Sequence, residues 1–418
     1  MLIKAFMDSR TATSPFVAIA CGGTGGHLFP GLAVAERIVE RACAVALLVS
    51  PKEVDQQAVK TVEGMEIVTL PAVGLQRGSE MAFVRGFSRS YRAAKTLFKS
   101  RPPCAALAMG GFTSAPPILA AKTLGAQTFL HESNTIPGRA NRWLSWVVNR
   151  AFVGFPSTRH RLNNRNVTII GTPVRRQFRL RNAGACRAAL GLDAARPVLL
   201  VMGGSQGASA INQMVIQSLP LLAKLAPGWQ WFHLTGPGDA QKVRQTYAAL
   251  KLTAVVHPFF AQMELALGAA TAAISRAGAS SLAELSALRV PAVLVPYPSA
   301  RGNHQFHNAR ALEESGAARL LEQKTATPGD LARLLVELVE NTPARQSIQN
   351  ALARWHRPRA AELIADMVLK AIGIKEDAPD DAGNPDSESG EPVPAFGLEV
   401  ASAGDVRLEA AETVRLEA

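Results

Sequence analysis

Short apolar runs alternate along this chain with longer segments that repeat apolar residues at helical spacing. Several of the runs are apolar at every position, which is typical of parallel strands buried on both faces of a sheet. The segments between them are long enough for crossover helices, so the pattern predicts an α/β fold. The expected strands are 16–21, 44–50, 66–70, 104–109, 127–130, 151–155 and 167–170 in the first half, and 198–202, 229–234, 255–259, 272–275, 292–295 and 318–321 in the second.

Two of these strands run directly into a glycine cluster that precedes a helix. The clusters are Gly22 to His27 and Gly203 to Gly207. A glycine turn there lets a ligand approach bare backbone, and the helix N-terminus offers free N–H groups and about half a positive charge. One such loop alone is more often a tight turn that binds nothing. Two loops, one in each half, predict two doubly wound α/β domains whose ligand-binding crevices face one another.

The spacing within the loops limits the class of nucleotide. Neither loop is followed by the Gly-Lys-Ser/Thr of a P-loop. The first also departs from the dinucleotide fingerprint, because Leu28 stands where the third glycine belongs. We therefore expect a mononucleotide or a nucleotide-sugar rather than NAD.

Breaks in the pattern divide the chain into four parts. Gly171 to Arg176 interrupts the strand and helix alternation with Gly and Pro before a basic stretch, so we place a boundary there. We expect one domain at 1–172, a second at 173–356, an amphipathic helix at 357–374 that packs back on the first domain, and a disordered tail at 375–418.

Charge is distributed unevenly over the 418 residues, 48% of which are hydrophobic. The segment 376–418 carries 12 acidic and 2 basic residues, which leaves a net charge of +22 on the rest of a chain whose total is +12. A body this basic favours nucleic acid, an acidic membrane surface or phosphorylated substrates as partners. Only 6% of residues are aromatic and no nucleic-acid-binding module is recognisable, so we expect no nucleic acid.

Targeting and redox signals are few. The four cysteines, Cys21, Cys43, Cys104 and Cys186, are widely separated, which fits a reducing compartment. The first 15 residues do not read as a signal peptide, and no apolar run approaches the roughly 20 residues that span a bilayer. We expect any membrane contact to be peripheral.

Four blocks of the sequence stand in the order and spacing of one known family: Gly22 to Ala35, His131 to Asn134, Gly171 to Arg175 and Gly203 to Gly207. With them the chain resembles the MurG family, the UDP-N-acetylglucosamine:undecaprenyl-diphosphate-muramyl-pentapeptide N-acetylglucosaminyltransferases. The resemblance implies a GT-B fold of two Rossmann-like domains with a cleft between them. It also implies inverting transfer of N-acetylglucosamine to the 4-hydroxyl of the muramyl sugar of lipid I, which gives lipid II for peptidoglycan, at the cytoplasmic face of the membrane.

The same resemblance implies the donor site, position by position. The first glycine loop lies near the donor sugar and diphosphate, the backbone after residue 259 pairs with the uracil, a helix start near 279–284 holds diphosphate and ribose, and a later glutamine reaches the sugar. The implied positions are Thr24, Gly25, Gly26, Asn134, Arg175, Ser205, Phe260, Ala279, Ser280, Ser281, Leu282, Ala283, Glu284 and Gln305.

Physical chemistry supports the helix start independently. Ser280 and Ser281 can cap a helix whose N–H groups bind a diphosphate, and Glu284 lies one turn later, where it can accept ribose hydroxyls. The alternative is a capping box of Ser281 and Glu284 that binds no ligand.

The transfer needs a base for the acceptor hydroxyl and positive potential for the departing UDP. His27 is the first candidate, with a capping or acceptor-binding role as its alternative, and Glu132 is the second, with orientation of Asn134 or His131 as its alternative. The chain has no Asp-x-Asp pair, so we expect no protein-bound metal and no obligatory cofactor. A Mg²⁺ ion held mostly by diphosphate oxygens would leave no trace in the sequence.

Two stretches suggest contact with an anionic membrane. Phe83, Phe87, Tyr91, Ala94 and Phe98 recur at helical spacing, with arginines and lysines on another face, and a second stretch runs from Arg142 to Trp146. Phe87, Tyr91 and Phe98 fit a sheet-covering role better, whereas the basic residues fit a lipid surface.

The competing functions are a UDP-N-acetylglucosamine 2-epimerase, another GT-B transferase, or a scaffold that binds a UDP-sugar without turnover.

Overall fold

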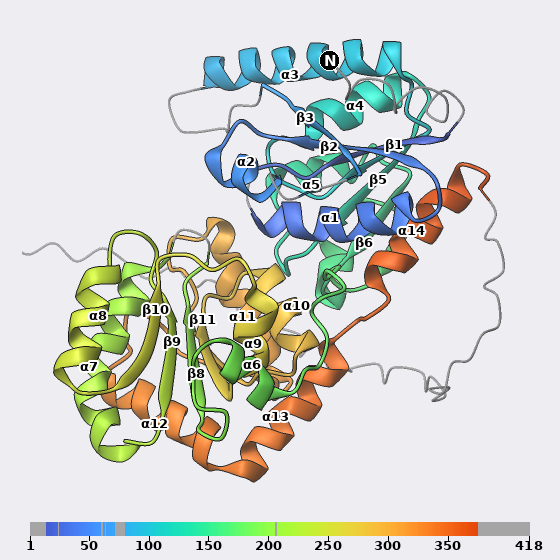
Figure 1. Cartoon of the computed structure of the whole chain (residues 1–418). Coiled ribbons are helices and arrows are strands. Elements are labelled where there is room, and N and C mark those ends of the chain that lie inside the picture. Colours follow the sequence, from blue (N-terminus) through green and yellow to red (C-terminus); the bar gives the residue numbers. More distant parts are fainter. Residues whose placement is uncertain are drawn as a thin grey trace, which may run out of the picture. The chain divides into compact units, whose positions relative to one another are not determined.

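The chain folds into two parallel β-sheets, each with helices on both faces (Figure 1). The computed structural model describes residues 14–23, 25–59, 62, 64–71, 80–204 and 207–374. The first sheet has the order β3-β2-β1-β4-β5-β6-β7 and the second the order β10-β9-β8-β11-β12-β13. In each sheet the order reverses beside the first strand, the place where ligands bind in such folds. The two-sheet prediction and the GT-B fold class are confirmed.

All thirteen expected strands are present. In the first sheet they are β1 (Phe16–Ala20), β2 (Ala44–Val49), β3 (Glu66–Thr69), β4 (Ala105–Ala108), β5 (Gln127–Glu132), β6 (Arg150–Val153) and β7 (Val167–Ile169). The second sheet contains β8 (Val198–Met202), β9 (Gln230–Leu234), β10 (Thr253–His257), β11 (Ala272–Ser275), β12 (Ala292–Leu294) and β13 (Arg319–Leu320).

The helices lie between these strands and after the last of them. Those of the first half are α1 (Gly25–Val39), α2 (Glu53–Val59), α3 (Glu80–Ser100), α4 (Ala115–Thr123), α5 (Arg139–Leu144) and the 3₁₀ helix η1 (Pro156–Arg161). Those of the second half are α6 (Ala183–Ala189), α7 (Ser209–Leu225), α8 (Ala240–Ala249), α9 (Met263–Ala269), α10 (Ala279–Ala287), the 3₁₀ helix η2 (Arg301–Asn303), α11 (His304–Glu314), α12 (Pro328–Glu340), α13 (Thr342–Trp355) and α14 (Ala360–Ala371).

Each face of the first sheet has its own hydrophobic core. One face packs against α1 and α14, and Ile364 and Val368 of α14 are fully buried there. The opposite face packs against α3 and α4, where Ala94 and Phe98 are fully buried. The last helix therefore covers the first sheet, although it follows the second sheet in the sequence.

Several predicted boundaries differ from the observed ones by two or three residues, and proline explains two of these differences. The strand expected at 255–259 is β10, which ends at His257 because Pro258 has no N–H to continue the ladder. The helix expected at 357–374 is α14, which begins only at Ala360. Arg357 precedes Pro358, and a residue in that position is disfavoured in the helical region.

Several sequence predictions fall in parts of the chain that are not described. Thr24 and Ser205 of the implied donor site and the tail from 375 lie outside the described residues. The proposed boundary at 172/173 falls in the connection between β7 and β8. Among the described helices, none is both long enough and apolar enough to cross a bilayer.

Candidate active site

The first glycine loop is fastened to its neighbours by buried polar groups. The Oδ2 atom of Asp55, on α2, accepts hydrogen bonds from the Gly23 N–H at 2.5 Å and from the Ser50 hydroxyl at 2.5 Å. On the other side, the Thr113 hydroxyl donates to the Gly22 carbonyl at 2.6 Å. Buried hydrogen bonds of this kind hold Gly22 and Gly23 in place at the end of β1.

His27 lies in the first turn of α1, against the glycines that follow β4. Gly110 has a φ of +109°, and a Cβ at that position would lie 2.8 Å from the imidazole Nδ1. Only glycine leaves room for the ring, because any other residue would overlap it and strain the backbone. Nδ1 is buried and has no hydrogen-bond partner among the described residues.

Burial also determines the charge of this imidazole. Burial lowers the pKa of His27 below its ordinary value of 6.5, and the nearby Glu132 carboxylate only partly opposes the shift. A histidine with a lowered pKa is neutral at pH 7. His27 is therefore in the protonation state that a general base requires.

Glu132 is a buried carboxylate at the end of β5 with four hydrogen-bond donors around it. Its Oε1 accepts from the Asn134 N–H at 2.9 Å and from the Asn134 side-chain amide at 3.0 Å. Its Oε2 accepts from the Gly138 N–H at 2.9 Å and the Asn141 amide at 3.0 Å. Each oxygen can accept about two hydrogen bonds, so both are fully used.

A chain of hydrogen bonds leads from Glu132 into the second half of the molecule. The Oδ1 atom of Asn134 accepts from the Asn308 amide at 3.0 Å, and the same amide donates to the Ala277 carbonyl at 3.1 Å. The Oδ1 atom of Asn308 accepts from both the N–H and the hydroxyl of Thr135 at 2.9 Å. Asn308 is completely buried on α11 and joins the end of β5 to the segment before α10.

The predicted diphosphate helix, α10, meets the first glycine loop. It begins at Ala279 with Gly278 as its N-cap and no capping side chain. The two serines therefore lie inside the first turn and do not cap the helix, and Ser281 and Glu284 do not form a capping box. Ser280 instead donates to the Gly26 carbonyl at 3.0 Å, which brings the two predicted parts of the site together. The first N–H groups of an uncapped helix remain available to an anion.

Arg175 lies close enough to Glu284 of α10 for its charge to influence the pKa of that carboxyl. Burial raises the pKa of Glu284 to about 7, and Arg175 opposes the shift. The Arg175 guanidinium lies over the rings of Phe29, at 4.4 Å from the centroid, and Phe178, at 5.1 Å. Among the described residues its buried Nε has no hydrogen-bond partner, and no carboxylate forms an ion pair with Arg175. The guanidinium therefore stays available to an anion.

The remaining implied donor residues lie on the second half. Phe260 follows β10 and packs edge-on against Phe232, with the ring centroids 5.1 Å apart. Gln305, on α11, accepts from the Tyr297 N–H at 2.9 Å. In the second glycine loop, Gly207 has a φ of +73°, and a Cβ there would overlap the Thr235 carbonyl. The uncapped helix α7 follows this loop.

No three or more His, Cys, Asp or Glu side chains of the described residues group in a way that could hold a metal ion.

Comparison with known proteins places these features in a family. The models described as the glycosyltransferase family 28 N-terminal and C-terminal domains match residues 17–153 and 198–364. A relative from Anaeromyxobacter sp. (strain K) is named UDP-N-acetylglucosamine--N-acetylmuramyl-(pentapeptide) pyrophosphoryl-undecaprenol N-acetylglucosamine transferase. It is 35% identical over 369 residues, which are 85% of this chain and 92% of the relative. The chain belongs to the MurG family.

Other comparisons agree with MurG membership. A Xanthomonas oryzae pv. oryzae (strain MAFF 311018) protein with the same name is 37% identical and aligns over 87% of this chain and 81% of its own length. The crystal structure of Acinetobacter baumannii MurG has a TM-score of 0.66 at 27% identity and covers 85% of this chain and 99% of its own. A putative UDP-N-acetylglucosamine 2-epimerase from Listeria monocytogenes has a TM-score of 0.64 at only 12% identity, which shows a shared fold alone.

Three contributors to this MurG-family site were missed from the sequence. Gly110 directly follows an apolar strand, as the two recognised glycine loops do, so the same sequence pattern could have identified it. Asp55 lies in a short polar helix, where an acidic residue normally faces solvent. Asn308 belongs to a block in which only Gln305 was singled out, and its partners are distant in the sequence.

Proposed function

We propose that this protein transfers N-acetylglucosamine from UDP-N-acetylglucosamine to the 4-hydroxyl of the muramyl sugar of lipid I, with inversion, and so makes lipid II. The observation that carries the proposal is the contact between Ser280 at the start of α10 and Gly26 beside His27, in a chain of the MurG family. This contact joins a candidate anion-binding helix to a candidate base. An inverting transfer needs both groups at one place.

The donor site is proposed to use helix ends and a few side chains. The free N–H groups of Ala279, Ser280 and Ser281 stabilise the diphosphate, and Arg175 adds a full positive charge. Glu284 accepts the ribose hydroxyls, and the backbone at Phe260 pairs with uracil. Gln305 and Asn134 lie toward the sugar. The remaining members, Thr24, Gly25, Gly26, Ser205, Leu282 and Ala283, complete the loops and the helix turn.

In the chemical step, His27 takes the proton of the acceptor hydroxyl as that oxygen attacks the anomeric carbon. The bond from that carbon to the diphosphate oxygen breaks, and UDP leaves with the electron pair. Glu132 is assigned a positioning role in this scheme, since four donors already occupy its oxygens. The proposal requires no obligatory cofactor. A Mg²⁺ ion bound mainly by the diphosphate is compatible with it, because magnesium retains waters and needs few protein ligands.

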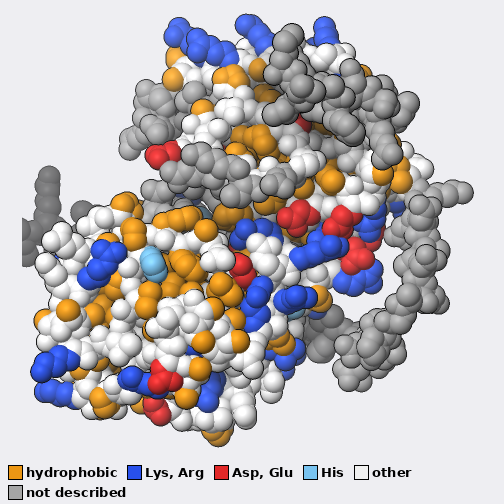
Figure 2. Space-filling view, viewed as in Figure 1, with side chains coloured by type: hydrophobic (Ala, Val, Ile, Leu, Met, Phe, Trp, Pro, Cys, Tyr) orange, Lys and Arg blue, Asp and Glu red, His pale blue; other side chains and the backbone are white. Residues whose placement is uncertain are grey.

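The lipid acceptor is proposed to reach the site from an anionic membrane surface, with the protein bound peripherally at the cytoplasmic face. Met81 and Val84 of α3 are 70% and 60% exposed, and Trp143 and Trp146 are 49% and 70% exposed. Exposed arginines of α3, among them Arg85, accompany them. Figure 2 shows Lys and Arg side chains gathered over α3. Exposed apolar side chains beside cations are suited to an anionic leaflet.

Replacing Glu284 by alanine should weaken UDP-N-acetylglucosamine binding by about 1–3 kcal/mol, because the ribose hydroxyls lose their acceptor. In the unmodified protein, affinity should rise as the pH rises through about 7, since the ionised carboxylate is the better acceptor. Calorimetric titration across pH measures both effects. Glu314→Ala, which removes an exposed carboxylate ion-paired with Arg310 at 2.7 Å, is the matched control. A lower melting temperature with unchanged affinity would contradict the ribose role.

Neutralising two arginines of α3 should weaken membrane docking. Each basic residue near an anionic leaflet contributes about 1 kcal/mol, so Arg85→Gln/Arg89→Gln should reduce binding to phosphatidylglycerol vesicles by roughly 30-fold at low salt. Vesicle sedimentation measures this, with Arg161→Gln/Arg333→Gln as a control of equal charge change. Turnover of a soluble acceptor analogue should not change. Equal binding of the two double variants would remove α3 from the docking surface.

A UDP-release assay with and without acceptor tests the proposed function against its alternatives. We expect UDP release from UDP-N-acetylglucosamine only when a short-chain lipid I analogue is present. Release of UDP or of an altered sugar without acceptor would indicate an epimerase or another sugar enzyme. Donor binding with no turnover under either condition would indicate a scaffold.

A further inference from the structure

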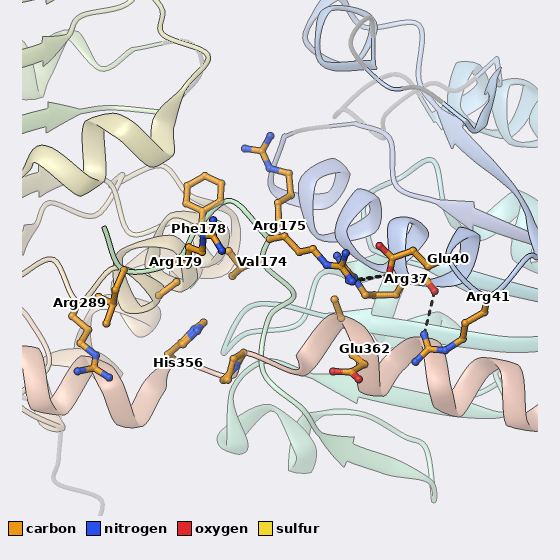
Figure 3. Close-up of a pocket in the computed structure, with 15 residues that line it drawn as sticks. Arg37, Glu40, Arg41, Val174, Arg175, Phe178, Arg179, Arg289, His356 and Glu362 are labelled. Atoms are coloured by element: carbon orange, nitrogen blue, oxygen red, sulfur yellow. Dashed lines mark hydrogen bonds and ion pairs between the residues drawn. The ribbon is translucent and has the colours of Figure 1, made fainter. Parts of the chain in front are cut away.

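A cavity lies at the C-terminal end of α10, whereas the proposed diphosphate site lies at the N-terminal end of this helix. Its volume is about 820 Å³, and its lining includes Arg37 and Glu40 of α1, Arg179, Arg289 after α10, and His356. Figure 3 shows Arg289 and His356 on one side of the cavity and Arg37 and Glu40 on the other, with Arg175 between them. The cavity reaches Ala287, the last residue of α10, whereas the proposed diphosphate site is at Ala279. The two ends of α10 are about 12 Å apart.

Part of the positive charge in this cavity is already neutralised. Glu40 accepts from Arg37 at 2.9 Å and from Arg176 at 2.7 Å. Arg41 is paired with Asp366. The remaining acid, Glu362, is paired with Arg359 at 3.2 Å. Each of these three carboxylates is therefore already paired with an arginine.

Three guanidinium groups that line the cavity have no acidic partner within 4 Å among the described residues: Arg175, Arg179 and Arg289. Because Arg175 is assigned above to the donor diphosphate, only Arg179 and Arg289 are counted for this cavity. The ends of α1 and α10 each place roughly half a negative charge nearby, and the start of α14 places roughly half a positive charge. Together these helix ends offset about half of one cation. More than one positive charge therefore remains without a counterion.

The start of α14 adds hydrogen-bond donors to this charge. Ala361 and Glu362, in the first turn of that helix, line the cavity, and the helix has no side-chain cap. Free N–H groups at a helix start bind phosphate oxygens. The imidazole of His356 also lines this cavity. Its pKa is lowered mainly by burial and further by the positive charges of Arg289 and Arg357.

We propose that this cavity is an anion-binding site for a phosphate or diphosphate group, separate from the donor site. The unpaired guanidinium groups supply the planar forks of donors that match phosphate oxygens. Because the start of α14 packs on the first sheet and Arg289 belongs to the second half, a diphosphate bound by both would link the two halves. The site does not depend on the proposed transferase activity. The group could belong to a free phosphate or to a lipid headgroup.

Calorimetric titration of the full chain with inorganic pyrophosphate tests this site. Saturating UDP is present to fill the donor site, and the titration is repeated without it. We expect one pyrophosphate to bind in the presence of UDP, and Arg179→Gln/Arg289→Gln to weaken that binding by about tenfold or more. Arg161→Gln/Arg333→Gln, which neutralises two exposed arginines outside the cavity, should leave it unchanged. The pKa of His356, followed by NMR, should rise on binding in the unmodified protein, since a nearby anion favours the imidazolium.

The source of the phosphate is separated by competition. Dihexanoyl-phosphatidylglycerol that displaces pyrophosphate, while dihexanoyl-phosphatidylcholine does not, identifies an anionic headgroup. Binding of pyrophosphate that neither lipid displaces identifies a free phosphate. The proposal is overturned if no pyrophosphate binds at about 10 mM in low salt, or if the cavity variant and the control bind equally. An unchanged His356 pKa on pyrophosphate binding would also overturn it.

Discussion

Replacing His27 by alanine should lower kcat by about 10²–10⁴-fold and leave UDP affinity nearly unchanged, as expected for loss of a general base. The imidazole packs against Gly110, and burial keeps it neutral at pH 7. In the unmodified protein, kcat/KM should fall as the pH falls through the lowered pKa of His27, because protonation removes the base. Steady-state kinetics across pH, on a soluble acceptor analogue, measure both effects.

A matched control for this variant is His160→Ala, which removes an exposed histidine on η1. It should leave the pH profile of kcat/KM in place. Turnover of the His27→Ala protein within a few-fold of the unmodified protein would contradict the assignment. Retention of the acidic limb of the pH profile in that variant would do the same, and the base would then have to be sought at Glu132.

Replacing Glu132 by alanine should lower the free energy of unfolding by about 3–5 kcal/mol, because four buried donors lose their acceptor. These donors come from Asn134, Gly138 and Asn141. Denaturant unfolding measures the effect, provided that the slope with denaturant stays constant. Turnover should also fall, since Asn134 and the connection to Asn308 lose their anchor.

Glu132→Gln distinguishes a positioning role from a catalytic one. Glutamine keeps the shape of the side chain, but its NH₂ group replaces an oxygen that accepts two hydrogen bonds. A positioning role therefore predicts a marked loss of stability with a smaller loss of turnover. Glu132→Asp should recover part of the stability. If Glu132→Gln retained full stability and lost turnover by about 10²-fold or more, the carboxylate would be the base instead.

The strands were predictable because buried parallel strands leave continuous apolar runs in the sequence. The two glycine loops were also recognisable locally, since each cluster of glycines directly follows such a run. The exact ends of strands and helices were harder to predict from the sequence. Pro258 and Pro358 moved two boundaries by two or three residues, and the start of α10 at Ala279 left its serines inside the first turn.

The rest of the site depends on contacts between distant segments. Nothing in the sequence around Asn308 indicates that its amide meets Asn134 at 3.0 Å. Similarly, Asp55 fastens the loop at Gly23 across a separation of 32 residues. The basic cavity brings Arg37 beside residues near 179 and 289, and no local period relates them. Such features become visible only when the two sheets are folded.

The central claim is that this protein joins N-acetylglucosamine to the muramyl sugar of a lipid-linked acceptor. The most direct test is product analysis after incubation of the purified full chain with isotopically labelled UDP-N-acetylglucosamine and a short-chain lipid I analogue. We expect UDP and a lipid product that carries one added N-acetylglucosamine, joined through the muramyl 4-hydroxyl with inverted anomeric configuration by NMR. Label that stays on the donor, or that appears as free or epimerised sugar while the acceptor is unchanged, would contradict the account.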